Sequence, residues 1–284
     1  MDEALLIQAR KLIRLALEED RGGAGDITSS AISSTRRACD GHFLVKGEGV
    51  IAGLEIAREV FHLVDDRILC EALLADGDAV HDGTTAIEVS GPARTLLTAE
   101  RTALNFLCRL SGVATLTRAY ADRIAGTKAR LLDTRKTTPG WRLLEKYAVV
   151  CGGGLNHRMG LYDMFLIKDN HIAAAGSISA AVAQCRAYQE EHHLAALIEV
   201  ESKNIAEVEE ALHLHVDRIM LDNMSLAMMS KCVARAGGRI PLEASGNINL
   251  DTVRAVAETG VDYISCGRLT HSAPILDISL DFLT

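Results

Sequence analysis

The spacing of apolar residues changes near residue 129 and divides the chain into two parts. In the first part, apolar side chains near the N-terminus recur every three or four residues, which is the spacing of one face of an amphipathic helix. Farther on, short β-rich runs surround a second helical pattern. This mixture predicts an α+β domain. Its helices are expected at residues 4–18, 54–64 and 93–125, the last broken near Ser111-Gly112, and its strands at residues 43–45, 68–74 and 86–89.

Beyond residue 129, short apolar runs alternate with helical stretches. Repeated strand–helix units imply a parallel sheet, either doubly wound or closed into a barrel. Nearly every run ends in a polar or charged residue, and the carboxyl ends of barrel strands form one mouth where chemistry occurs. We therefore favour a barrel. Its strands are expected at residues 129–133, 164–168, 196–200, 218–222, 240–244 and 262–265, and its helices at residues 141–150, 177–191, 204–214, 225–236 and 250–259.

The chain has 284 residues and 48% hydrophobic content, which is enough to bury such cores without disulfides or metal ions. The seven cysteines are scattered and include no C-x-x-C pair, so we expect neither a zinc site nor a disulfide framework. Buried thiols of this kind are typical of a reducing compartment, and we expect the cytoplasm. We predict an α/β sandwich domain at residues 1–115, a barrel at residues 116–270, and a tail at residues 271–284 that packs back on the first domain.

The formal net charge of −8 argues against nucleic acid or an anionic membrane as a partner. We find no signal peptide and no apolar run of transmembrane length. Within this acidic chain, residues 130–171 are nevertheless strongly basic. Three of their cations, Arg135, Lys136 and Lys168, lie at or just past predicted strand ends. Cations that converge on one pocket repel one another unless an anion is present, so the pattern indicates a polyanionic substrate. A solvated face is the simpler interpretation for three others: Arg130, Arg142 and Lys146.

Carboxylates are expected at the same mouth. Glu199 and Glu201 are two residues apart on a predicted strand and so face the same side, while Asp222 ends the next strand. The simpler interpretation is that they form salt bridges with the cations. The functional alternative is a divalent ion, because Mg²⁺ prefers one or two carboxylates together with substrate phosphates and water. Clustered cations beside such carboxylates fit a metal-bound diphosphate, and both interpretations remain open at this point.

Small residues follow the last two predicted strands, as Ser245-Gly246-Asn247 and Cys266-Gly267-Arg268. Barrel enzymes often bind phosphate through backbone N–H groups in these loops, and glycine permits the close approach. The string Gly47–Ala52 matches a dinucleotide-binding pattern. Residues 41–90 lack the series of βαβ units that such a site needs, so we interpret this string as a turn.

Several of these strings resemble the quinolinate phosphoribosyltransferase family. The likeness runs in order over essentially the whole chain, and it implies an N-terminal α/β sandwich, an incomplete α/β barrel and a homodimer. It also implies Mg²⁺ bound with phosphoribosyl pyrophosphate, with Glu199 and Asp222 as the expected metal ligands, and no organic cofactor. The strings are residues 19–28, 100–105, 133–140, 156–158, 168–171, 199–201, 221–223, 243–246 and the tail around Gly267.

The resemblance also implies residue roles. Positions matching Arg135, Lys136, His157, Arg158 and Lys168 line the quinolinate and phosphate pocket, and Arg101 reaches it from the partner subunit. The expected catalytic residues are Lys136, Glu199 and Asp222. The expected substrate-binding residues are Arg101, Thr134, Arg135, Lys136, His157, Arg158, Lys168, Glu199, Glu201, Asp222, Ser245, Gly246, Asn247, Cys266, Gly267 and Arg268.

The implied reaction converts quinolinate and phosphoribosyl pyrophosphate into nicotinate mononucleotide, pyrophosphate and carbon dioxide, a step of NAD biosynthesis. Two alternatives remain at this point. One is a related phosphoribosyltransferase with another anionic substrate, such as nicotinate or the substrate of the molybdenum-locus paralogues. The other is a non-catalytic anion sensor on the same fold.

Overall fold

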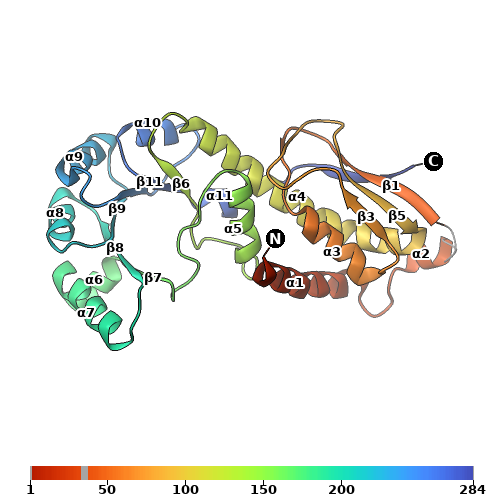
Figure 1. Ribbon diagram of the computed structural model, residues 1–284, viewed down its shortest axis with the longest axis horizontal. Helices are drawn as coiled ribbons and strands as arrows, with labels where there is room; N and C mark the ends of the chain where they lie inside the picture. The colour runs from red at the N-terminus through yellow and green to blue at the C-terminus, as the bar shows by residue number, and fades with distance from the viewer. Residues whose placement is uncertain (1, 33–37, 284) are drawn as a thin grey trace. The chain divides into compact units, whose positions relative to one another are not determined.

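The structure, a computed structural model, describes residues 2–32 and 38–283, and these form two compact units (Figure 1). Unit 1 is Met1–Arg118, Thr137–Gly153 and Leu269–Thr284, and unit 2 is Ala119–Lys136 and Gly154–Arg268. The domain ranges expected from the sequence placed residues 137–153 in the barrel, whereas these residues cluster with unit 1. Each unit is described by itself below.

Unit 1 is built on an antiparallel sheet with the strand order β12-β1-β5-β3. The C-terminal strand β12 pairs with β1, so the tail completes this sheet. Phe43 and Phe61 meet edge to face in the core, with ring centroids 5.7 Å apart. The strands are β1 (Ala38–Val45), β2 (Gly49–Val50), β3 (Leu69–Ala72), β4 (Ala79–Val80), β5 (Thr85–Pro92) and β12 (Ile278–Phe282). The helices are α1 (Glu3–Arg21), α2 (Ile27–Ile32), α3 (Leu54–Val64) and α5 (Arg142–Cys151), with the start of α4 (Ala93–Arg123) and the end of α11 (Arg268–His271).

Helix α4 continues without interruption through Ser111 and Gly112, so the expected break there is wrong. Ser111 is buried, and its hydroxyl accepts a hydrogen bond from the Ala52 amide at 3.0 Å. A Cβ on Gly112 would lie 1.9 Å from the carbonyl oxygen of Pro274. The small residues therefore serve close packing against neighbouring backbone and do not end the helix.

Unit 2 contains a six-stranded sheet in which every pair of neighbours is parallel, with the order β6-β11-β10-β9-β8-β7. Among the described residues its two edge strands, β6 and β7, do not pair with each other, so the sheet is barrel-like but open. This confirms the predicted incomplete α/β barrel. The strands are β6 (Arg130–Leu132), β7 (Met164–Ile167), β8 (Leu197–Ser202), β9 (Arg218–Asp222), β10 (Leu242–Ser245) and β11 (Tyr263–Ser265). The helices that follow them are α6 (Asp169–Ala175), α7 (Ile178–Glu191), α8 (Ile205–His213), α9 (Leu226–Ala236) and α10 (Val253–Glu258).

The expected strands and helices of the barrel part agree with the observed ones to within a few residues at each end. The strands are short, buried and rich in branched apolar residues, as strands covered on both faces are. Within residues 2–32 and 38–283, no helix has the length and apolar character needed to cross a membrane.

Candidate active site

Several of the site residues expected from the sequence lie at the carboxyl edge of the unit 2 sheet. Thr134, Arg135 and Lys136 follow β6, and Lys168 follows β7. Glu201 lies near the end of β8. Because all six strands are parallel, these ends share one edge of the sheet.

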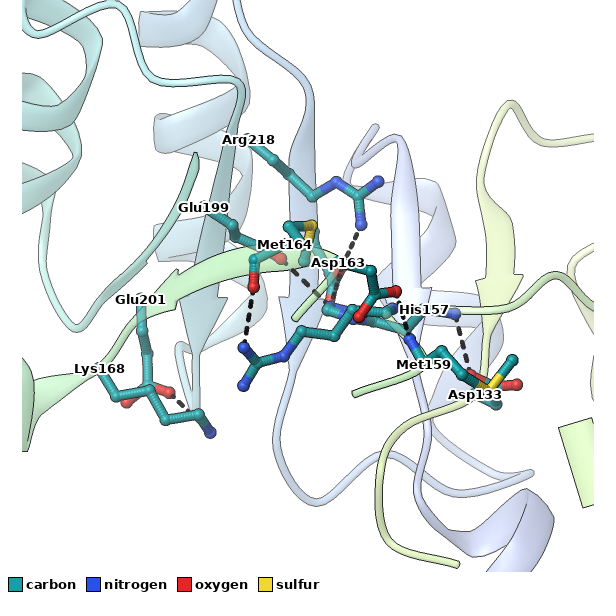
Figure 2. A network of polar contacts seen from close by, with 11 residues as sticks. Asp133, His157, Met159, Asp163, Met164, Lys168, Glu199, Glu201 and Arg218 are labelled. Carbon is teal, nitrogen blue, oxygen red and sulfur yellow. Dashed lines mark hydrogen bonds and ion pairs between the residues drawn. The ribbon is translucent and has the colours of Figure 1, made fainter. Parts of the chain in front are cut away.

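A group of four charged or titratable side chains lies beneath this edge, and we call it the buried cluster: His157, Glu199, Arg218 and Glu243 (Figure 2). His157 Nε2 lies 3.1 Å from Glu199 Oε2 and 3.5 Å from Glu243 Oε2. Arg218 Nη1 donates to Glu243 Oε2 at 3.0 Å. Glu199 and Glu243 are both fully buried. Charges buried this deeply are stable only when they are paired, and here the pairing comes from the protein itself.

The sheet fixes the position of Arg218 from two sides. Arg218 is in register with Glu199 on β8, which places both side chains on the same face of the sheet. Its guanidinium carbon also lies 4.4 Å from the centroid of the Tyr263 ring, a cation–π distance.

The pKa values of the buried cluster reflect competition between burial and pairing. Burial lowers the pKa of His157, but the contacts with Glu199 and Glu243 outweigh it and raise that pKa above its ordinary value. Burial and the neighbouring Glu243 raise the pKa of Glu199. Burial alone would raise the pKa of Glu243, yet His157 and Arg218 hold it below its ordinary value. Contacts between opposite charges therefore offset the effect of burial on His157 and Glu243.

Both ring nitrogens of His157 have defined neighbours. The Arg158 amide donates to Nδ1 at 2.7 Å, while Nε2 faces the carboxylates. The His157 amide in turn donates to Oδ1 of Asp133, which is fully buried at the end of β6, at 2.9 Å. Side chain and backbone of His157 thus connect the barrel interior to the segment that carries Arg158.

Arg158 is half-buried, and its Nη1 donates to the carbonyl of Met164, the first residue of β7, at 3.0 Å (Figure 2). Burial lowers the pKa of the Arg158 guanidinium, and the nearby positive charge of Arg135 lowers it further. The structure therefore brings two guanidinium groups close together. An anion with two or more negative oxygens would relieve this repulsion.

A second set of charges lies closer to solvent. Lys168 Nζ is 3.4 Å from Glu201 Oε2. The pKa of Glu201 is raised by burial and by the negative charge of Asp222, and is lowered by Lys168. We call the charged residues of this edge, together with Arg158, the rim group: Arg135, Lys136, Arg158, Lys168, Glu201 and Asp222.

The register of the sheet corrects one expectation from the sequence. Glu199 pairs with Arg218, and Asp222 is four residues farther along the same strand. At about 3.3 Å per residue this places their α carbons roughly 13 Å apart along the strand direction, farther than the two side chains can span through one ion. They cannot bind one ion, because Mg²⁺–oxygen distances are about 2 Å. Glu201 is in register with Met220, only two residues before Asp222, and these two form the closer pair.

A different set of potential ligand atoms lies inside the buried cluster. One atom each from His157, Glu199 and Glu243 come within 4.8 Å of one another, a spacing that a metal ion could bridge. Arg218 already pairs with Glu243, so a cation is present there as part of the protein.

The loop after β10 requires glycine at its first position. Gly246 has φ of +98°, and a Cβ there would lie 2.2 Å from Asn223 Oδ1. Asn223 Oδ1 also accepts from Asn247 Nδ2 at 3.0 Å, which links the loops after β9 and β10. Gly267 is half-buried and Arg268 is exposed at the start of α11.

Cys266 has a different surrounding from the one expected for a binding residue. Its thiol is buried and donates to the carbonyl of Ile248 at 3.5 Å, and its amide donates to the carbonyl of Leu132 at 3.0 Å. Its side chain and amide therefore face the protein, so within this loop Gly267 and Arg268 are the better candidates.

The remaining cations named in the sequence analysis differ in exposure. Lys146 is fully buried, so the interpretation as a solvated residue is wrong. Arg142 is half-buried and donates to Thr137 Oγ1 at 3.1 Å, whereas Arg130 of unit 2 is exposed as expected. Arg101 is exposed on α4 and belongs to unit 1.

Glu243 and Arg218 are central to the site, although neither was among the expected site residues. The available signal was a charge inside an otherwise apolar strand, because a carboxylate at the third position of residues 241–245 must be buried with a partner. Identifying that partner requires the register.

An open parallel barrel with converging cations at its carboxyl edge defines a class of α/β-barrel enzymes that act on anionic substrates. Two family models match the chain: the C-terminal domain of quinolinate phosphoribosyl transferase over residues 113–281 and the N-terminal domain over residues 26–111. The chain belongs to the quinolinate phosphoribosyltransferase family.

Individual relatives agree. The chain is 46% identical to quinolinate phosphoribosyltransferase (decarboxylating) 1b of Nicotiana tabacum, across 95% of this chain and 81% of that protein. It is 44% identical to the probable nicotinate-nucleotide pyrophosphorylase (carboxylating) of Bacillus subtilis, across 97% and 93%. The crystal structure of NadC from Streptococcus pyogenes superposes with a TM-score of 0.92 at 42% identity, covering 98% of both chains.

Proposed function

We propose that the protein is a decarboxylating quinolinate phosphoribosyltransferase, a pentosyltransferase of NAD biosynthesis. It joins quinolinate to phosphoribosyl pyrophosphate and releases pyrophosphate and carbon dioxide. The observation that carries this proposal is the pair of interacting guanidiniums, Arg135 and Arg158, in a member of this family that also has Lys168 at the carboxyl edge of its sheet. Two adjacent ring carboxylates match two guanidinium forks and an ammonium group.

The rim group binds and orients both reactants. Arg135, Arg158 and Lys168 hold the quinolinate carboxylates, and Lys136 neutralises charge that develops on the leaving pyrophosphate. The ring nitrogen attacks C1 of the ribose as the bond to pyrophosphate breaks. Positive charge develops on the sugar carbon, and the Asp222 carboxylate stabilises it electrostatically.

Charge sets the order of the two bond changes. Loss of carbon dioxide leaves an electron pair on the ring carbon next to nitrogen. A neutral pyridine stabilises this pair poorly, whereas the ribosylated, cationic nitrogen holds it as an ylide, which then takes up a proton. Transfer therefore precedes decarboxylation. The cation at the departing carboxylate should bind it more weakly than the other cations bind the retained one.

Mg²⁺ supplies charge neutralisation for the diphosphate when it is bound. Asp222 and Glu201 are the residues that would hold it, since both are carboxylates near the ends of neighbouring strands. Lys168 pairs with Glu201 and neutralises part of their negative charge. Glu199 has no part in that set. The loops at Ser245–Asn247 and Gly267–Arg268 bind the 5′-phosphate through backbone N–H groups.

The working form is proposed to be a homodimer in which Arg101 completes the partner's pocket. The test mixes two inactive variants, Arg101→Ala and Lys168→Ala, under conditions where subunits exchange. A shared site predicts recovery of activity, because one of the two sites in each mixed dimer has both residues. No recovery despite proven exchange contradicts it.

We place the protein in the cytoplasm, which is consistent with seven free cysteines. Relatives from plants carry chloroplastic or mitochondrial names, so fractionation of cells with an antibody against this chain is the direct check.

The substrate is tested by assaying quinolinate and nicotinate side by side with phosphoribosyl pyrophosphate. We expect nicotinate mononucleotide from quinolinate and little turnover of nicotinate, since a single carboxylate balances the positive charge of only one of the two guanidiniums. Preferred turnover of nicotinate would identify the related transferase instead, and binding without turnover would identify an anion sensor.

A further inference from the structure

The buried cluster has no direct role in the chemistry proposed above, and yet it holds two fully buried carboxylates, Glu199 and Glu243. Buried ion pairs are seldom the most stabilising choice, since apolar residues of similar volume often serve stability as well or better. Their presence here calls for an explanation in terms of what they position.

The contacts form a continuous chain from Arg218 to the segment that carries Arg158, and Figure 2 shows its members Arg218, Glu199 and His157. Tyr263 and Glu243 hold Arg218, and Glu243 and Glu199 face Nε2 of His157. At the other side of the ring, Nδ1 accepts the Arg158 amide.

The proton count follows from these contacts. Glu199 and Glu243 attract protons to the imidazole, and the Arg158 amide occupies the lone pair of Nδ1. The carboxylates raise the pKa of His157, but a second proton on Nδ1 would break the hydrogen bond from the Arg158 amide. While that bond is made, the ring carries a single proton, on Nε2. The positive charges of Arg218 and Arg158 balance the two carboxylates, and Arg158 is close enough for the charge of Glu199 to act on it.

We propose that Glu243, Arg218 and Glu199 are positioning residues that hold His157 with Nε2–H toward the barrel interior, so that His157 in turn fixes the Arg158 backbone and guanidinium for quinolinate. This inference rests on the proposed function. His157 then acts mainly as a support for Arg158, since both of its ring nitrogens face protein groups. The second anchor of Arg158, its bond to the Met164 carbonyl, fixes the other end of the side chain.

The proposal predicts a selective defect when the cluster is altered. Glu243→Gln keeps the shape of the side chain but removes the charge that faces both His157 and Arg218. We expect the KM for quinolinate, and the Kd of quinolinate for the free enzyme, to rise about tenfold, the loss typical of one charge-assisted hydrogen bond. The KM for phosphoribosyl pyrophosphate and kcat should change by less than about threefold, because the rim carboxylates are untouched.

A matched control exists in unit 1. Glu59 is also buried and also pairs with an arginine, Arg10, at 2.7 Å, but it lies outside the barrel. Glu59→Gln makes the same chemical change and should leave both KM values as they are. A folded Glu243→Gln enzyme, judged by circular dichroism, with wild-type quinolinate binding would overturn the proposal.

A measurement on the unaltered enzyme keeps the test decisive if Glu243→Gln does not fold. In ¹⁵N-histidine-labelled wild-type protein at neutral pH, with the His157 signal assigned by comparison with His157→Gln, Nε2 should carry the proton and Nδ1 should be bare. A proton on Nδ1 would contradict the proposed support of Arg158. Lack of quinolinate turnover by wild type would instead refute the proposed function and leave this geometry standing.

Discussion

The buried cluster and the rim group contain the same kinds of side chain but differ in how their charges are balanced. In the buried cluster, each carboxylate has a cationic or proton-donating partner within the protein, as in the Arg218–Glu243 contact at 3.0 Å. At the rim, cations are close to other cations, as Arg135 is to Arg158. The first arrangement is balanced without a ligand, whereas the second is improved by an anion. Charges that are balanced within the protein and charges that favour an added anion are therefore kept in two separate groups.

The largest expected effect follows from removing a charge at the buried level. Glu243→Ala leaves Arg218 buried without its carboxylate, and breaking a buried pair in this way costs about 3–5 kcal/mol of folding free energy. Urea unfolding of the variant and wild type measures the difference. A loss of unfolding free energy below about 1 kcal/mol would show that the buried cluster does not stabilise the fold, and its contrast with the rim group would not hold.

The next largest effect is expected at the rim, where the roles are reversed. Lys168→Ala should reduce kcat/KM for quinolinate by about ten- to a hundredfold, the equivalent of roughly 1.5–3 kcal/mol for a charged contact. Its unfolding free energy should stay within about 1 kcal/mol of wild type, because the Lys168 side chain is 46% exposed. Steady-state kinetics and urea unfolding of the same preparation check both halves.

A smaller effect is expected at the loop after β10. Gly246→Ala puts a Cβ 2.2 Å from Asn223 Oδ1 on a residue with φ of +98°, so the loop must shift. Backbone strain of this kind costs about 1–3 kcal/mol. We expect a rise of about tenfold in the KM for phosphoribosyl pyrophosphate, with the Kd of quinolinate unchanged. An equal rise for both substrates would place this loop outside the phosphate site.

The smallest effect should come from an exposed pair near the same sheet edge. Lys203 Nζ lies 3.0 Å from Asp169 Oδ2, and both side chains are about half exposed. Exposed pairs contribute about 0–1 kcal/mol. Lys203→Ala should therefore change unfolding by less than about 1 kcal/mol and kcat/KM by less than about twofold. A loss of kcat/KM comparable to that of Lys168→Ala would show that lysines outside the rim group contribute equally to activity, which contradicts the assignment of this role to the rim group.

Most of the fold could be predicted from the sequence because its signals are local. The helix at Leu54–Val64 and the strand at Arg218–Asp222 were expected with the bounds that the structure gives them. The break expected at Gly112 was wrong because glycine there serves a long-range contact with Pro274, which no local pattern reveals.

The site was partly predictable for a related reason. Strand ends and the family resemblance both indicated Lys168 and Asp222. Which carboxylates on neighbouring strands lie side by side, however, depends on the strand register. Without register, Glu199 was expected to bind a metal with Asp222, whereas it pairs with His157 deep in the barrel. Glu243 was overlooked for the same reason, since its partner Arg218 is on the neighbouring strand.

The central claim is that the rim cations hold two anionic reactants at once, so that transfer enables decarboxylation. The most direct test is incubation of the purified enzyme with quinolinate labelled in the carboxylate next to the ring nitrogen, with and without phosphoribosyl pyrophosphate. The account predicts labelled carbon dioxide and nicotinate mononucleotide in equal amounts with both reactants, and no labelled gas from quinolinate alone. Release of labelled carbon dioxide without phosphoribosyl pyrophosphate, or nucleotide that keeps the label, would contradict it.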